Sequence, residues 1–217
     1  ELAKKKSSGP VIRDGVVDID SYGMRPKILF LLKEANDLET TDGWDLRTFV
    51  ATTKRRYTWD NVARWVYGIR HLKENPAWEF VQQRAAEEKH DLLRSIVVMN
   101  LKKTPGGART DEAAMLRWAH THAGLLKEQF SFYEPDLIIC GGRSTSSVAQ
   151  KIGLITPTEK KQTSNGVWYT KLSQRTTWIT YYHPQARLSH RFLYEKLITA
   201  VKEVVAMPVT HDKKKVE

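Results

Sequence analysis

The chain has 217 residues, of which 41% are hydrophobic, and its 35 Lys and Arg outnumber its 25 Asp and Glu. This length and this hydrophobic fraction predict one folded domain with a substantial core. The single cysteine, Cys140, excludes an intrachain disulfide and any zinc or iron–sulfur site built from cysteines. No apolar run approaches the roughly 20 residues that a membrane-spanning helix needs.

The formal net charge of +10 favours a polyanionic partner such as nucleic acid over a neutral ligand. Lys4–Lys6 and Lys213–Lys215 supply part of that charge, but about +4 remains without them. The alternative is that the charge serves only solubility. We expect a basic mobile N-terminal arm over 1–20, a single domain over 21–207 and a basic tail over 208–217. We also expect an intracellular, cytoplasmic protein (nucleoid-associated if bacterial) that contacts no membrane.

Four continuous apolar runs are typical of strands that are covered on both faces, and therefore of a parallel sheet. A shorter run over 167–170 adds a possible further strand before the last of them. In chain order, the four predicted strands are 28–32, 95–99, 137–140 and 177–181.

Apolar residues at helical spacing separate these runs and predict helices over 59–72, 78–93, 110–132 and 189–206. Thr110 is the expected N-cap of the third, followed by Asp111 and Glu112 in the first turn. The alternation of strand and helix predicts the α/β class. We expect a central, mainly parallel four-stranded sheet with helices on both faces, which is a three-layer sandwich.

Polar segments follow each of the four predicted strands. Because the carboxyl ends of parallel strands lie at one edge, these segments are expected to converge there, the usual place for ligands in open α/β folds. The alternative is ordinary turns with an incidental histidine. The segments are 33–37, 100–107, 141–147 and His183-Pro184.

The third of these segments, Gly141-Gly142 leading into Ser144, is typical of a turn onto a helix N-terminus that can hold a phosphate. It lacks the pattern of a nucleotide-hydrolase phosphate loop and of a dinucleotide-binding loop. The histidines lack convincing ligand partners; His120 and His122, two apart on a predicted helix, point in different directions. We therefore expect no metal.

Taken together, three blocks of the chain resemble the uracil-DNA glycosylase superfamily, in order and approximate spacing, over about residues 25–205. The first is the strand and loop Lys27–Asn36. The second is Asn100–Arg109 with the helix after it and the strand that leads to Ser144. The third, His183–Arg187, is similar to the family's His-Pro-Ser motif and intercalating loop. The missing cysteines set the chain apart from the branches with an iron–sulfur cluster, so no cofactor is expected.

The resemblance implies that the protein removes a base that has been flipped out of DNA. It assigns support of the leaving base to His183 and reading of the base edge to Asn100. Glu34 is the carboxylate that would place the water. The loop lacks the glycine and proline that the family often has there, so Asn36 and Asp37 remain alternatives. Arg187 falls where the family inserts a side chain into the emptied stack.

Asn36 matches the position where strictly uracil-specific members keep a tyrosine, so we hypothesise a pocket that admits larger, substituted pyrimidines. Trp59 is the expected stacking partner of the base, and Trp44, Phe49 and Tyr57 are alternatives. Contacts with DNA are expected from side chains that follow the strands, namely Lys102, Ser144, Arg187 and Arg191.

The leading interpretation is a monomeric, metal-independent DNA glycosylase that acts in base-excision repair or in defence against viruses with modified DNA. A catalytically inactive relative that binds DNA is the second interpretation, because the loop around Glu34 is unusual. A third is an unrelated nucleotide-binding or hydrolytic α/β enzyme, although neither a nucleophile elbow nor a phosphate loop is visible in the sequence.

Overall fold

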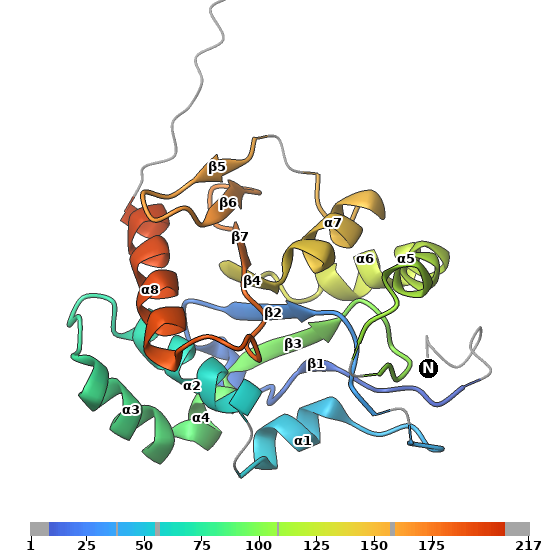
Figure 1. Ribbon diagram of the computed structural model, residues 1–217, viewed down its shortest axis with the longest axis horizontal. Helices are drawn as coiled ribbons and strands as arrows, with labels where there is room; N and C mark the ends of the chain where they lie inside the picture. Colours follow the sequence, from blue (N-terminus) through green and yellow to red (C-terminus); the bar gives the residue numbers. More distant parts are fainter. Residues whose placement is uncertain (1–8, 38, 55–56, 108, 157–158, 207–217) are drawn as a thin grey trace, which may run out of the picture.

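The computed structural model describes residues 9–206, apart from 38, 55–56, 108 and 157–158. Its centre is a mixed sheet with the strand order β1-β3-β2-β4-β7-β6-β5 (Figure 1). The strands are β1 Gly15–Val16, β2 Ile28–Leu32, β3 Ile96–Asn100, β4 Leu137–Gly141, β5 Lys161–Gln162, β6 Trp168–Lys171 and β7 Thr177–Tyr181.

The α/β class is confirmed, and the four predicted strands are the central parallel ones, β3-β2-β4-β7. The expected four-stranded sheet was wrong in extent, because the sheet has seven strands and is mixed. β1 pairs antiparallel with β3, and β6 pairs antiparallel with both β5 and β7. β1 and β5 contain two residues each and the β5 residues are exposed, so neither produces an apolar run in the sequence.

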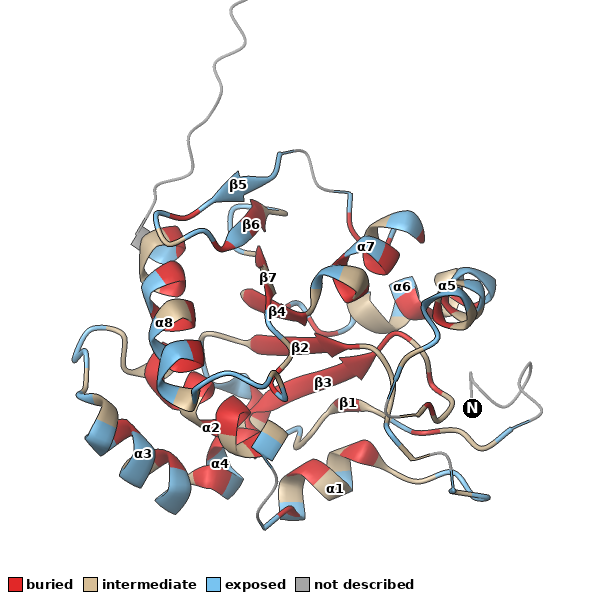
Figure 2. Cartoon of the chain, in the orientation of Figure 1, coloured by how far each residue is buried: buried red, intermediate tan, exposed pale blue. Residues whose placement is uncertain are grey.

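Residues along the central strands face two separate cores. Ile28, Phe30 and Leu32 pack into one cluster, whereas Leu29 and Leu31 pack into the other. Because successive side chains of a strand point to opposite faces, a strand covered on both sides must be apolar throughout. Figure 2 shows these strands as buried along their length.

Helices cover both faces of the sheet, as predicted. Residues of α1, α2, α3, α4 and α8 pack on one face, and residues of α5, α6, α7 and the short 3-10 helix η1 pack on the other (Figure 1). The bounds are η1 Ser21–Gly23, α1 Leu46–Thr52, α2 Tyr57–Arg70, α3 Trp78–Glu87, α4 Lys89–Arg94, α5 Glu112–Thr121, α6 Ala123–Ser131, α7 Arg143–Lys151 and α8 His190–Ala206.

Two predicted helices are each divided in the structure. The segment 78–93 breaks at Glu88, and 110–132 breaks at His122, where α5 ends and α6 begins. Thr110 is not the N-cap of α5. Asp111 takes that position, because its Oδ1 accepts a hydrogen bond from the backbone N–H of Ala114 at 3.0 Å. Apolar spacing persists through both breaks, so periodicity alone could not locate them.

The folded domain begins before the predicted boundary at residue 21. Ile12 is 1% exposed, and β1 extends the sheet beside β3. The predicted arm over 1–20 therefore packs on the domain in its described part, from residue 9, because the segment has apolar and acidic side chains with partners in the body. Residues 1–8 and the predicted tail over 208–217 lie outside the described residues. None of the described helices has the length and apolar character needed to cross a bilayer.

Candidate functional site

The structure brings the four strand-end segments together around one cleft of about 1390 Å³ at the carboxyl edge of the parallel strands. Lys102 and Arg191 are the two predicted site residues that do not line it. The predicted residues in its lining are Glu34, Asn36, Trp59, Asn100, Ser144, His183 and Arg187.

The loops after β2 and β3 continue the pairing of those strands into the cleft. The backbone N–H of Lys102 donates to Lys33 O at 2.9 Å, and that of Gly106 donates to Ala35 O at 2.8 Å. The N–H of Asp37 then donates back to Gly106 O at 3.0 Å. Glu34 lies between Lys33 and Ala35, whose carbonyl groups accept two of these bonds. The position of the Glu34 backbone is therefore fixed by its neighbours.

Glu34 lies at the cleft with its side chain only 6% exposed. Lys102 Nζ donates to Glu34 Oε2 at 2.5 Å and to Pro105 O at 2.8 Å, and the Lys102 side chain is 15% exposed. Lys102, expected to contact DNA, is thus directed at Glu34. The carboxylate also packs against Gly106, where an added Cβ would lie 2.0 Å from Glu34 Cδ. Gly106 therefore makes room for the carboxyl group.

His183 lies two residues after the end of β7, and its ring is oriented by the turn that follows it. The backbone N–H of Gln185 donates to His183 Nδ1 at 3.0 Å, so Nδ1 is an acceptor and the proton of the neutral ring is assigned to Nε2. Burial, together with the nearby positive charge of Lys33, lowers the pKa of His183 from 6.5 to about 4. At neutral pH the ring is therefore an uncharged donor through Nε2.

Asn100 is the last residue of β3, lines the cleft and is 2% exposed. Its backbone N–H donates to Asp14 Oδ2 at 2.6 Å. Its side-chain amide makes no hydrogen bond with another described residue. Since a buried amide without partners is costly, and since an amide both donates and accepts, this group is suited to a polar ligand edge in the cleft.

The four aromatic candidates differ in how far their side chains are exposed. Trp59, near the start of α2, is 5% exposed and belongs to the core, although it lines the cleft. Trp44 and Phe49 are half-buried, meet edge to face at 5.7 Å and also line it. Trp44 Nε1 donates to Asp37 Oδ2 at 2.9 Å. Tyr57 is 41% exposed and its ring lies against that of His190.

The loop after His183 is tied to α2. Asn61 is fully buried, and its Nδ2 donates to Pro184 O at 2.7 Å, while the Tyr57 hydroxyl donates to Leu188 O at 3.1 Å. This support leaves Arg187 exposed on the cleft wall and Leu188 40% exposed beside it. Asn61 was not predicted from the sequence, because a polar residue inside a helical pattern carries no sign of its distant partner.

Two predicted DNA contacts occupy different surroundings. Ser144 lies in the first turn of α7, after Gly142, whose φ of 113° favours glycine, and it faces the cleft. Arg191 lies on α8 outside the lining, where its Nε donates to Glu195 Oε1 at 2.7 Å and its Nη1 is 3.7 Å from Glu79. Ser144 therefore fits a contact inside the cleft and Arg191 a contact beyond its rim.

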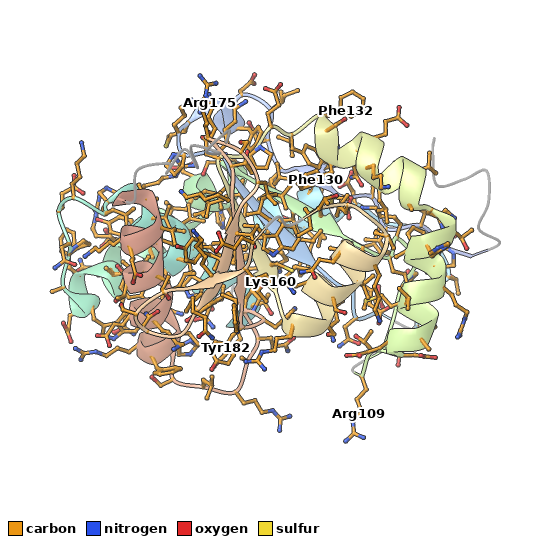
Figure 3. All side chains as sticks on the ribbon, turned by 90° about the horizontal axis from the view of Figure 1, so that it is seen from above. Arg109, Phe130, Phe132, Lys160, Arg175 and Tyr182 are labelled. Carbon is orange, nitrogen blue, oxygen red and sulfur yellow. The ribbon has the colours of Figure 1, made fainter. Side chains whose placement is uncertain are left out.

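Arg109 is an exposed cation of the cleft that was not singled out from the sequence. Figure 3 shows its side chain projecting from the edge of the molecule that carries Tyr182, away from the opposite edge with Arg175. Its position as a basic residue in the loop after a predicted strand could have identified Arg109 from the sequence. Over the described ranges, no three or more His, Cys, Asp or Glu side chains are grouped as a metal ion would require.

Neither the protein-family models nor the curated proteins contain a match to this chain.

Proposed function

We propose that this protein is a DNA glycosylase that hydrolyses the N-glycosidic bond of a flipped-out uracil or of a larger substituted pyrimidine. The observation that carries the proposal is the meeting of Glu34, Asn100 and His183 in one cleft, each from the end of a different parallel strand. A carboxylate, a buried amide and a neutral imidazole donor are the groups that this hydrolysis requires.

The reaction follows from these groups. The bond between the sugar C1′ and the base nitrogen breaks with its electron pair going to the base, so positive charge grows on the sugar and negative charge on the base. His183 Nε2–H donates to the base oxygen on which the negative charge develops. The Glu34 carboxylate stabilises the sugar cation and orients a water molecule. That water adds to C1′ and passes a proton to the Glu34 carboxylate, and the base leaves as the anion, which takes up a proton from solvent. The carboxyl group then releases its proton to solvent.

Recognition of the base is assigned to the Asn100 amide. A pyrimidine such as uracil presents a carbonyl acceptor next to an N–H donor, and one amide can satisfy both. Because the Asn100 side chain is buried and makes no hydrogen bond with another described residue, a base without that edge leaves its polar groups unpaired. Asn36 is exposed in the lining, which supports a pocket wide enough for a substituent on the ring.

A catalytically inactive DNA-binding relative is the second candidate, and the state of Glu34 favours it. The carboxylate is paired with Lys102 and almost fully covered, so it offers little surface to a water molecule in this arrangement. The two candidates differ in whether free base is released from DNA.

The test is a panel of duplexes that carry uracil, a thymine mismatch, hypoxanthine or a 5-substituted cytosine. Wild-type protein is expected to release base from one or more of them. Glu34→Gln and Glu34→Ala are expected to abolish release while retaining DNA binding, and Glu74→Gln, on the exposed surface, to behave as wild type.

Near-wild-type release by both Glu34 variants would remove Glu34 from the mechanism. Action on uracil alone would reject the wider pocket. If the wild type binds DNA and releases no base from any duplex, the inactive relative is the correct assignment. Repair and defence against modified viral DNA differ in whether the preferred base is a lesion or a viral modification.

A further inference from the structure

We propose that Lys102 is a positioning residue for Glu34 and not a contact for the DNA backbone. This inference rests on the proposed function, since it concerns how the catalytic carboxylate is prepared. It is carried by the geometry of Lys102, Glu34 and Gly106 in the paired loops after β2 and β3.

The Lys102 ammonium group is committed inside the protein. It has three N–H donors, of which one goes to Glu34 Oε2 at 2.5 Å and one to Pro105 O at 2.8 Å. Its side chain is 15% exposed, and it is absent from the cleft lining. A lysine that contacts a phosphate must present its ammonium group to solvent. Lys102 instead presents it to a carboxylate.

Three elements enclose the Glu34 carboxylate. The Lys102 ammonium holds one oxygen, the Gly106 backbone packs against the carboxyl carbon, and the hydrogen bond between Gly106 N–H and Ala35 O keeps the two loops together. Rotation of the side chain towards Gly106 is blocked by that contact. The carboxylate is therefore fixed in place, as positioning of a reacting water requires, and small displacements of catalytic groups have large effects on rate.

Lys102 also supplies the charge that a covered carboxylate needs. Removing a carboxylate charge from water is costly unless an opposite charge or hydrogen-bond donors accompany it. The other titratable or charged side chains that line the cleft are Lys33, Asp37, Tyr57, Arg109, His183 and Arg187. Among the described residues, Lys102 is the cation recorded in an ion pair with Glu34.

The experiment compares Lys102→Met with Arg109→Met, an exposed cation in the cleft wall. Single-turnover base release at saturating protein and equilibrium DNA binding over a range of salt are measured for each variant. Lys102→Met is expected to lower the rate constant by about 10²-fold or more, with DNA affinity and its salt slope unchanged. Arg109→Met is expected to reduce the salt slope of DNA binding by about 1. Lys160→Met, on the exposed surface outside the cleft, is expected to keep both the rate constant and the salt slope.

A conservative variant adds a readout that a merely structural role would not move. Lys102→Arg keeps the positive charge that pairs with Glu34 and is expected to recover part of the rate constant. Gly106→Ala leaves Lys102 intact but displaces Glu34, and its rate constant is expected to fall with unchanged DNA affinity, which covers the case that Lys102→Met does not fold.

A Lys102→Met protein with the wild-type rate constant at saturation would overturn the inference, as would a reduced salt slope in that variant, which would make Lys102 a DNA contact. A wild-type rate constant in Gly106→Ala would equally overturn it. If the wild type releases no base, the proposed function fails and this inference fails with it. If the wild type is active and only the Lys102 predictions fail, the proposed function stands.

Discussion

Two neighbouring lysines after β3 enter ion pairs of different kinds. Lys102 pairs with Glu34 at the cleft, whereas Lys103 pairs with Asp14, its Nζ lying 2.7 Å from Oδ1. Successive residues of an extended chain point to opposite sides, so the two side chains leave the same segment in different directions. One lysine of the segment pairs with a carboxylate at the cleft, and the next pairs with a carboxylate of the N-terminal segment.

The Lys103 pair is the more deeply buried and the more fully bonded. The Asp14 side chain is 1% exposed and also accepts from the Asn100 backbone N–H at 2.6 Å and from Gln129 Nε2 at 2.8 Å. Burial lowers the pKa of Lys103, and the Asp14 carboxylate opposes that shift. This network joins the N-terminal segment to the end of β3 and to α6. Glu34, by contrast, borders an open cleft, and its recorded ion pair within the described part of the chain is with Lys102.

Burial alone therefore does not distinguish the pair at the cleft from the pair that joins the N-terminal segment to β3 and α6. Both lysines are largely covered, and both carboxylates nearly so. The two ion pairs differ in the surroundings of their carboxylates. Asp14 is surrounded by donors from the fold, whereas the surface of Glu34 that the protein leaves open belongs to the cleft.

The largest expected effect on folding comes from breaking the Lys103 pair. Lys103→Met leaves the buried Asp14 charge unpaired, and the free energy of unfolding is expected to fall by about 3–5 kcal/mol. Urea denaturation at pH 7 measures it. Lys102→Met is the matched control and is expected to lose less, because the Glu34 side chain is 6% exposed and the Asp14 side chain 1% exposed. Equal losses in the two variants would remove the distinction between the pairs.

The next largest expected effect is on the pH dependence of folding stability, and it arises from His183 in the cleft lining. Its pKa is about 4 in the folded protein and 6.5 in the unfolded chain, so the unfolded chain binds the proton more tightly. The stability linked to this ring is full above pH 6.5 and is lost as the pH falls towards 4, by about 3 kcal/mol at most. Urea denaturation of the wild type and of His183→Gln at pH 7 and pH 4.5 measures this. Parallel losses in both proteins would contradict it.

The smallest expected effect distinguishes an aromatic residue that is partly exposed in the cleft from one that is buried in the core. Phe49, half-buried in the cleft, is expected to stack on the base, so Phe49→Ala should weaken binding of the flipped nucleotide by about 1–3 kcal/mol. Its loss of stability is expected to be smaller than that of Trp59→Ala, because Phe49 packs against the core with only part of its side chain buried. Trp59 is 5% exposed, so Trp59→Ala should chiefly destabilise the fold. Substrate titration and urea denaturation of both variants measure this, and the reverse pattern would restore Trp59 as the stacking residue.

The amino-acid sequence by itself determined the central strands and the edge at which the site lies. Strands covered on both faces must be apolar throughout, so the four strands could be predicted from four apolar runs. The polar residues that follow each run must lie at the end of its strand, so the location of the cleft could be predicted as well. The edge strands β1 and β5 were not readable, because two residues that pair with a neighbour need no distinctive composition.

The partners of the site residues were decided by the tertiary structure alone. Glu34 and Lys102 are 68 positions apart, and Asp14 and Lys103 are 89 apart. In the sequence, Lys102 and Lys103 are two identical residues in one basic loop. Which carboxylate each lysine meets, and which of two cavities that carboxylate borders, depends on the side of the segment from which the side chain extends and on the elements packed there. A local pattern carries no information about that packing, because the partners come from distant parts of the chain.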